Sequence, residues 1–110
     1  MFFANTPPPP YYAVIFTSQR TDKESDSYHK AAHKMVELAS KQPGFLGVES
    51  AREQNGLGIT VSYWDSLDAI GQWKENLSHQ RAQEKGKKDW YSSYITRICK
   101  VERDYANESQ

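Results

Sequence analysis

An α+β domain is expected from this sequence, with two β-α-β units that share one antiparallel sheet and place both helices on the same face. Segments rich in β-branched and aromatic residues alternate with amphipathic helical segments. A tight turn joins the two middle strands directly, and the order is strand, helix, strand, strand, helix, strand. This βαββαβ order is that of a ferredoxin-like fold, and 110 residues suffice for one such domain.

The first half of the chain predicts an arm, a strand and a helix. Residues 1–10, MFFANTPPPP, form a flexible, Pro-rich N-terminal arm, because a proline run favours polyproline geometry and cannot begin a helix or a central strand. Residues 11–18, YYAVIFTS, have the composition of a strand. A helix is expected over 25–41, ending before Pro43-Gly44, because one helical face collects the apolar residues Tyr28, Ala31, Ala32, Met35, Leu38 and Ala39.

The second half predicts a hairpin, a second helix and a last strand. Its elements are strands over 45–53 and 57–64 around a turn at 54–56, a helix over 66–76 with a further turn or two over 78–88, and a strand over 90–103. The domain therefore spans residues 11–105, and the polar residues 106–110 form a C-terminal tail.

Composition and charge argue against several classes of protein. Hydrophobic residues make up 37% of the chain, and the charged residues, 25%, are split evenly between acids and bases. This balance predicts binding neither to nucleic acid nor to an anionic membrane. No apolar run is long enough to cross a bilayer, and the N-terminus lacks the features of a signal peptide. The single cysteine, Cys99, cannot form an internal disulfide, so a cytoplasmic location is expected.

The strands are apolar on both faces, which predicts a homodimer. In the first strand Val14 falls on one face and its neighbours Ala13 and Ile15 on the other, and the last strand repeats this pattern. Two helices can cover only one face of the sheet. The second face is therefore expected to pack against a second copy, giving a dimeric α/β barrel. The alternative, a monomer with an exposed aromatic face, would be unusual.

Aromatic residues around the second helix predict a pocket for a flat aromatic molecule. A strand ends on Tyr63 and Trp64, Trp73 follows nine residues after Trp64, and His79 comes six residues later. Indole rings stack on flat ligands, and an imidazole transfers protons near neutral pH. Trp73 and His79 are the candidate catalytic residues, and the candidate substrate-binding residues are Trp64, Tyr63, Arg52, Trp90 and Tyr94.

Each catalytic candidate has a structural alternative. Trp73 could simply join the second helix to the sheet, and His79 could contact carbonyl groups at a helix end. No metal site is expected: His29 and His33 are four residues apart, but no third ligand accompanies them, and the lysines that flank them indicate an exposed helical face.

Two stretches resemble the antibiotic biosynthesis monooxygenase (ABM) domain family. They are PGFLGVES at 43–50, a Pro-Gly-hydrophobic turn into a strand, and ITVSYWDSLDAIGQW at 59–73, a strand that ends in Trp before an acidic or serine cap. The closing stretch WYSSYITRICKVERDY is similar to that of a bacterial subgroup of small uncharacterised ABM-like proteins. The resemblance covers about residues 11–105 and implies a dimer of ferredoxin-like domains.

The resemblance also implies the chemistry that such domains carry. Members include cofactor-independent monooxygenases of polycyclic aromatic substrates, quinol monooxygenases and haem-degrading enzymes. In the haem-degrading branch a Trp on the second helix presses on the porphyrin, a His ligates iron and an Asn on the first strand assists. Trp73 matches that Trp, but His79 lies closer to it than in that branch, and YYAVIFTS contains no Asn.

Three hypotheses of function follow. The first is a cofactor-independent monooxygenase that oxidises a small aromatic or quinone-like molecule with O2, with Trp73 and His79 orienting the substrate and moving protons. The second is a haem-binding or haem-degrading protein with the same two residues at the haem. The third is a non-catalytic dimeric domain that binds a ligand or a partner, which a core-packed Trp64 and Trp73 would favour.

Overall fold

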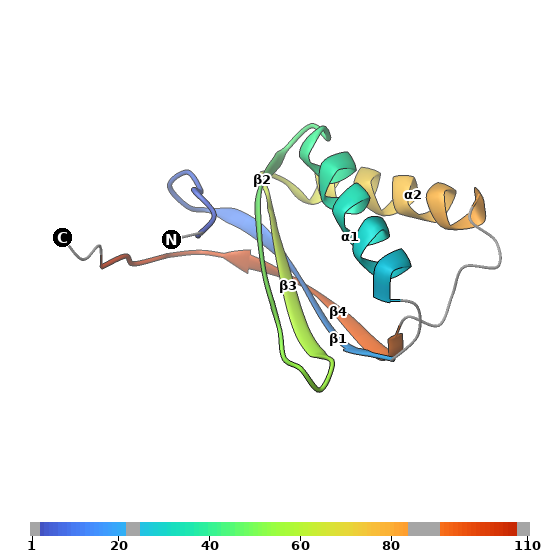
Figure 1. The fold of residues 1–110 in the computed structure, drawn as a ribbon. Helices are drawn as coiled ribbons and strands as arrows, with labels where there is room; N and C mark the ends of the chain where they lie inside the picture. Colours follow the sequence, from blue (N-terminus) through green and yellow to red (C-terminus); the bar gives the residue numbers. More distant parts are fainter. Residues whose placement is uncertain (1–2, 22–24, 84–90, 108–110) are drawn as a thin grey trace.

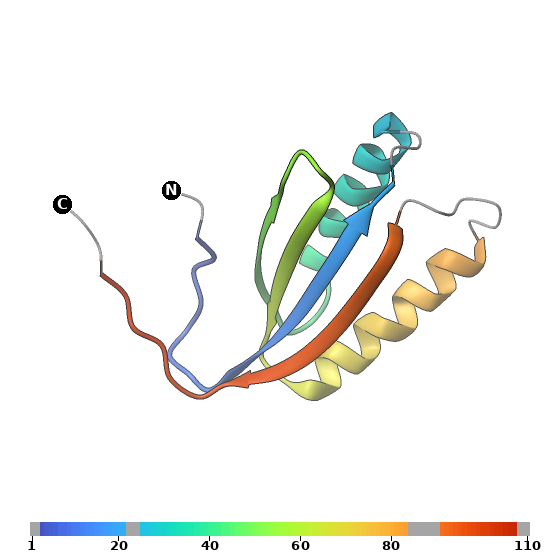
Figure 2. The same ribbon diagram turned by 90° about the horizontal axis from the view of Figure 1, so that it is seen from below.

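A computed structural model describes residues 3–21, 25–83 and 91–107, and it shows the predicted order of strands and helices (Figure 1). The elements are β1 (Tyr11–Arg20), α1 (Ser25–Ser40), β2 (Phe45–Arg52), β3 (Leu57–Trp64), α2 (Leu67–Gln83) and β4 (Tyr91–Val101). The strands form one antiparallel sheet in the order β2-β3-β1-β4. Both helices lie on the same face of this sheet (Figure 1 and Figure 2), so the ferredoxin-like α+β fold is confirmed.

Several element boundaries differ from the predicted ones. β4 ends at Val101, two residues before the predicted end at 103, and the ends of α1 and β2 and the start of α2 differ by one residue each. β1 continues two residues further, to residue 20, because Gln19 still pairs with Leu57 of β3. α2 does not stop at 76 but runs on to Gln83, so the extra turns predicted from residue 78 continue the same helix. The predicted turns over 84–88 and the first residue of the predicted last strand, Trp90, lie outside the described residues.

The strand register decides which positions share a face of the sheet. Tyr12 lies opposite Trp64, which packs against α2, so both belong to the face that the helices cover. Ala13 lies opposite Tyr63 on one side and Cys99 on the other, and these positions share the opposite face. We call the two sides the helix face and the free face.

The core lies on the helix face, at the end of β3. Its buried residues are Ala39 of α1, Trp64 of β3, and Ala69, Ile70 and Trp73 of α2. Ala69 and Ile70 precede Trp73 by four and three residues, so one side of the helix presents all of them to the sheet. No helix in the described part of the chain is both long and apolar enough to span a membrane.

A tight junction between β3 and α2 fixes where α2 begins. Gly44 has a φ of 88°, and a side chain there would come within 2.6 Å of both Asp65 and Ala69. The Asp65 N–H donates to the Gly44 carbonyl at 2.8 Å. Ser66 caps α2, because its Oγ accepts a hydrogen bond from the Ala69 N–H at 3.1 Å. These contacts hold the buried side of α2 over the Trp64 end of the sheet.

The free face is apolar and partly exposed. Leu57, Ile59 and Ile95 are 45%, 46% and 47% exposed. Leu57 and Ile95 also line a hollow of about 400 Å³ on this face. Partly exposed apolar side chains of this kind favour packing of the free face against another layer of protein.

The segment before β1 is tethered beside the free face. The Ala4 N–H donates to Glu49 Oε2 at 2.7 Å, and Thr6 Oγ1 donates to the Tyr11 hydroxyl at 3.1 Å. The Tyr11 hydroxyl in turn donates to Asp104 Oδ2 at 2.6 Å, beyond the end of β4. Residues 4 and 6 of the predicted flexible arm are therefore hydrogen bonded to the sheet region.

Candidate functional site

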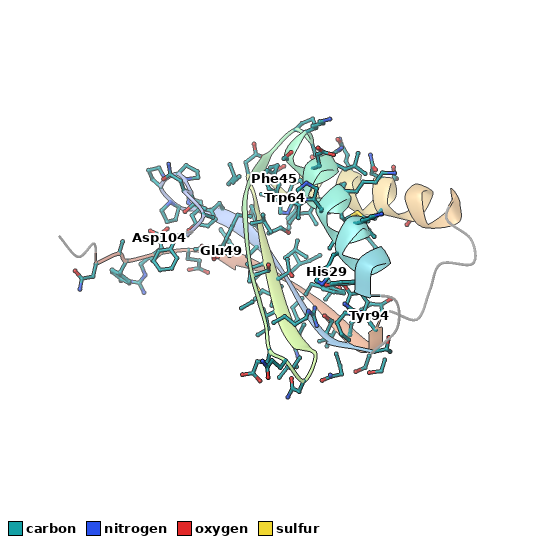
Figure 3. All side chains as sticks on the ribbon, in the orientation of Figure 1. His29, Phe45, Glu49, Trp64, Tyr94 and Asp104 are labelled. Atoms are coloured by element: carbon teal, nitrogen blue, oxygen red, sulfur yellow. The ribbon has the colours of Figure 1, made fainter. Side chains whose placement is uncertain are left out.

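Four aromatic residues gather on the helix face, at the end of β1 that lies away from the core. Phe16 contacts Tyr91 and Tyr94 of β4, with ring centroids 5.3 Å apart in both pairs. Tyr28 of α1 meets Tyr91 edge to face at 5.8 Å. We call these four residues the ring cluster. Figure 3 shows Tyr94 well away from the core residue Trp64. Tyr94 is 56% exposed, so a flat molecule can reach its ring.

Two arginines lie against the ring cluster. Arg20 Cζ lies 3.7 Å from the centroid of the Tyr28 ring. Arg52 Cζ lies 5.8 Å from the Tyr28 centroid and 5.7 Å from the Tyr91 centroid. All three distances are within the range of cation–π attraction. The ring cluster therefore sits beside two permanent positive charges, which suits a ligand whose ring develops negative charge.

Hydrogen bonds to neutral groups hold Arg52 in place. Its Nη2 donates to Ser18 Oγ at 2.7 Å, and its Nη1 donates to the carbonyl groups of Gly56 and Ser18. Beneath it, Gly58 leaves room for the guanidinium, since a side chain there would come within 2.5 Å of Arg52 Cζ. Arg52 thus ties β2 to β1 and to the β2–β3 turn in one geometry.

Tyr91 can donate a proton in a hydrogen bond but is unsuited to act as a base. Burial raises the pKa of Tyr91 well above its ordinary value, and its hydrogen bond to Tyr28 raises the pKa further. The nearby Arg20 and Arg52 guanidinium groups oppose this rise only in part. The Tyr91 hydroxyl donates to the Tyr28 hydroxyl at 3.3 Å. Because the neutral phenol is favoured, Tyr91 stays protonated at neutral pH.

A hollow of about 220 Å³ lies beside the ring cluster. Arg20 at the end of β1, His29 of α1 and Arg52 at the end of β2 line it, together with the β2–β3 turn at 53–56. The turn is docked on β1, because the Arg20 N–H donates to the Gly56 carbonyl at 2.9 Å and Gln19 Nε2 donates to the Asn55 carbonyl at 2.6 Å. The walls of this hollow are therefore held together by backbone as well as side-chain contacts.

The two tryptophans that were predicted to line a pocket fill the core instead. Trp64 is 0% and Trp73 8% exposed, and their indoles stack with centroids 6.0 Å apart. Trp64 Nε1 donates to Ser62 Oγ at 2.9 Å, and Phe45 packs edge to face on Trp64 at 5.4 Å. Neither indole lines the two hollows described above. The prediction that these rings surround an empty space is wrong, because close packing of large apolar rings is more favourable than a void.

Tyr63, another predicted substrate contact, lies on the free face. Its hydroxyl donates to Glu49 Oε1 at 2.8 Å, and its ring meets Tyr11 edge to face at 5.8 Å. Burial and the hydrogen bond to Glu49 raise the pKa of Tyr63 to about 12. The sheet separates Tyr63 from the ring cluster, so the two do not form one site.

Of the predicted site residues, the structure brings Arg52 and Tyr94 to the same end of the helix face. His79 lies in α2, six residues after Trp73, but its side chain is outside the described part of the structure, and so is all of Trp90. Six residues correspond to about 600° of rotation, which places position 79 about 120° around the helix from Trp73. The backbone therefore puts positions 73 and 79 on different sides of α2.

Sequence reasoning missed Phe16, Tyr28, Tyr91 and Arg20. A signal for Phe16 was present, because alternation along β1 and β4 places it on the same face as the predicted site residue Tyr94 once the strands are paired. Tyr28 was assigned to the apolar side of the first helix but not to a site. No metal site is added: within the described residues no group of three or more His, Cys, Asp or Glu could hold an ion.

Comparison with known proteins shows to which family this chain belongs. The sequence profile of antibiotic biosynthesis monooxygenases matches residues 10–85. The chain belongs to the antibiotic biosynthesis monooxygenase family. Among its relatives, the uncharacterized protein YqjZ of Bacillus subtilis (strain 168) is 56% identical over 102 residues, which are 93% of this chain and 89% of YqjZ.

A more distant ABM relative has a named activity. The jasmonate monooxygenase ABM of Pyricularia oryzae is 26% identical over 94 residues, or 82% of this chain. The match covers only 43% of that longer protein.

Solved structures of two functional kinds share the fold of this ABM domain. One is SnoaB of Streptomyces nogalater, a cofactor-independent oxygenase, with a TM-score of 0.64 and 15% identity over 90% of this chain and 98% of SnoaB. The other is MhuD of Mycobacterium tuberculosis, a haem degrader with two haems in its active site, with a TM-score of 0.63 and 15% identity over 86% of this chain and 99% of MhuD. Identities this low show a common fold and no more.

Proposed function

We propose that this ABM domain is a monooxygenase that oxidises a small aromatic or quinone-like molecule with O2, without a bound metal, flavin or haem. One observation carries the proposal: the exposed ring of Tyr94 stands beside Phe16 and Tyr91 on the helix face, next to the fixed guanidinium of Arg52. The rings offer a stacking surface to a flat substrate, and the guanidinium offers stabilisation to negative charge that develops on it. Family membership supports the class of reaction.

The reaction needs a substrate that itself supplies the electrons. An aromatic molecule with a phenol or enol conjugated to a methylene group loses a proton and passes electrons to O2. One oxygen atom then replaces the two hydrogens of the methylene carbon, which becomes a carbonyl group, and the other oxygen atom leaves with those two hydrogens as water. All four electrons come from the substrate carbon, and the balance requires no separate reductant.

The remaining work is assigned to three residues: Arg52 and Tyr91 at the ring cluster, and His79 of α2. Arg52 stabilises the substrate anion, because its charge is permanent and its geometry is fixed before the substrate arrives. Tyr91 stays protonated and therefore does not take the proton. His79 is the proposed proton acceptor, since an imidazole titrates near neutral pH.

Oxygen consumption with anthrone-type phenols, in which a methylene group is conjugated to the phenol, tests the proposal. We expect turnover of at least one such compound, and a decrease in kcat/KM of about tenfold to a hundredfold in Arg52→Met and in His79→Ala. Arg103→Met, which removes an exposed guanidinium beyond β4, should leave kcat/KM unchanged. The proposal fails if no compound consumes oxygen faster than it does in buffer, or if both variants turn over at the parent rate.

A second candidate is a non-catalytic domain that binds the same kind of flat ligand. The packing of Trp64 against Trp73 favours it, because the two indoles provide no enclosed reaction chamber. Stacking on Tyr94 requires only an open surface. Saturable binding of aromatic ligands together with an absence of oxygen consumption would select this candidate over the monooxygenase.

Haem does not fit the residues that the structure describes. The position that matches the porphyrin-contacting Trp of the haem-degrading branch, Trp73, is 8% exposed and stacked on Trp64. β1 contains no Asn. We therefore expect haemin to show no saturable shift of its Soret band when it is titrated with the protein. A shift that saturates at one haem per chain would contradict this expectation.

We further propose that two copies pack through their free faces. The support is the apolar surface left by Leu57, Ile59 and Ile95, which two helices on the opposite side cannot cover. Because the symmetry of a homodimer brings the same patch of each copy together, an apolar face of this kind is self-complementary in chemistry. The ring clusters would then lie on the outer, helix-covered sides of the two sheets.

A further inference from the structure

Charged and ring-nitrogen side chains line the hollow beside the ring cluster. Among the described residues, its charged side chains are Arg20, Arg52 and Glu53, and His29 adds a ring nitrogen. In this described part of the wall, two guanidinium groups face the hollow with one carboxylate, and Glu53 is exposed, so water weakens its effect. A space of about 220 Å³ has room for a carboxylate group and part of the molecule that bears it.

Arg52 has hydrogen-bonding capacity left over for a ligand. Its described partners are a hydroxyl and two carbonyl groups, all neutral, and within the described residues it forms no ion pair. These contacts use one N–H of Nη2 and both of Nη1, so among the described residues the second Nη2 hydrogen and the Nε hydrogen have no acceptor. A carboxylate would provide charged acceptors for this pair, because its two oxygens match the edge of a guanidinium.

The position of Arg52 links the hollow to the ring cluster. The same guanidinium that lines the hollow lies 5.7 Å from the Tyr91 ring centroid. Tyr91 in turn contacts Tyr94, with centroids 6.2 Å apart. A molecule whose carboxylate meets Arg52 therefore has its aromatic part directed towards exposed rings. We propose that the hollow is a carboxylate-binding subsite and that the ligand of this domain is an aromatic acid; that this acid is also oxidised rests on the proposed function.

Binding of a charged and a neutral probe of equal shape tests the subsite. The probes are 2-naphthoate and 2-naphthamide, titrated calorimetrically into the full chain under nitrogen so that no turnover occurs. Because hydrogen bonds to charged groups are stronger than neutral ones, we expect 2-naphthoate to bind about tenfold more tightly than the amide. Arg52→Met should abolish this preference while 2-naphthamide binds as before. Arg103→Met, the matched loss of an exposed guanidinium, should preserve the preference.

A second variant keeps the test decisive if Arg52→Met fails to fold. Gly58→Ala retains Arg52 but displaces its guanidinium, because the new methyl carbon would lie within 2.5 Å of Cζ. We expect this variant to lose most of the preference for 2-naphthoate. Equal affinity for the two probes, no binding of 2-naphthoate at millimolar concentration, or a preference that survives in both variants would overturn the subsite.

These outcomes are separate from those that test the monooxygenase. A preference for 2-naphthoate without any oxygen consumption would support the carboxylate-binding subsite and contradict the proposed monooxygenase. Conversely, oxygen consumption with neutral phenols and no preference for the acid would support the monooxygenase and contradict the subsite.

Discussion

Burial separates the aromatic side chains that hold this domain together from those that can meet a ligand. Trp64 and Trp73 are almost entirely enclosed and stack on each other, whereas Tyr94 keeps more than half of its surface open. The first two therefore contribute to the free energy of folding, and Tyr94 is available for stacking.

Replacing a core tryptophan should cost stability and leave ligand binding intact. We expect Trp73→Ala to lower the free energy of unfolding by about 3–5 kcal/mol, because it removes a large buried ring and leaves a cavity beside Trp64. Tyr94→Ala should lower it by less than about 1 kcal/mol, since that ring is half exposed. Urea unfolding followed by circular dichroism measures both. If a Trp73→Phe variant is as stable as the parent protein but no longer binds aromatic ligands, this prediction is wrong and Trp73 belongs to the binding site.

Tyr63 should make stability fall at alkaline pH. The folded protein holds the Tyr63 proton up to a pKa of about 12, mainly because burial and Glu49 disfavour the phenolate. The unfolded chain releases that proton at the ordinary tyrosine pKa of about 10. Between these two values the folded state binds more protons, so the free energy of unfolding decreases as pH rises from about 10 to about 12.

Comparison with Tyr63→Phe isolates this contribution from those of Tyr11 and Tyr91, whose pKa values are also raised. The variant should be less sensitive to pH in this window than the parent protein. Parallel pH profiles of the two proteins would show that burial and Glu49 do not raise the pKa of Tyr63 in the folded state.

Among the elements, α2 depends most on how its first turn is attached. The junction joins the Gly44 turn to Asp65 and Ser66, and it sets the side of α2 that faces Trp64. Because the turn has a positive φ and no room for a side chain, the local sequence there is restricted by both conformation and contact.

Two glycine substitutions should have opposite effects. Gly44→Ala should destabilise the domain by about 1–3 kcal/mol from backbone strain alone, and contact with Asp65 and Ala69 adds to this. Gly71→Ala lies within α2, where a side chain would meet nothing within 4 Å, and should stabilise the domain by about 0.5–1 kcal/mol. Thermal unfolding of the two variants checks both signs, and a stabilising Gly44→Ala would contradict the junction described above.

At the level of the whole molecule, the sheet has one face that helices cover and one that they leave open. Figure 2 shows α1 and α2 on the same side, and Leu57, Ile59 and Ile95 are partly exposed on the other. The proposed homodimer would remove these side chains from water by joining two such faces.

A charge on the free face should therefore separate the copies. We expect Ile59→Lys to have the mass of one chain, 12.7 kDa, in light scattering, whereas the parent protein should have twice that mass. Ile98→Lys is a matched control, because Ile98 lies on the helix face of the same sheet and is 53% exposed. Its mass should remain that of the parent protein. A parent protein of 12.7 kDa would refute the face-to-face dimer.

Local composition was sufficient to predict the elements of this domain. Turn residues at 43–44 and 54–56, β-branched strands and a helical period of apolar residues led to the correct order and to the sheet with both helices on one side. Apolar residues at successive positions of β1 also predicted that both faces of the sheet are apolar. These features depend on residues close together in the chain, and a linear sequence displays them directly.

Contacts between distant residues could not be predicted in the same way. The sequence brought Trp64 and Trp73 together correctly but could not show that they fill the space between them, because that depends on how closely α2 approaches the sheet. Arg52 and Tyr94 were proposed as site residues. Their neighbours Phe16, Tyr28 and Tyr91 could be identified only from the tertiary structure, in which β4 pairs with β1 and α1 lies across the sheet. The period of the side chains determined the elements; the packing of those elements determined which rings are covered and which remain open to a ligand.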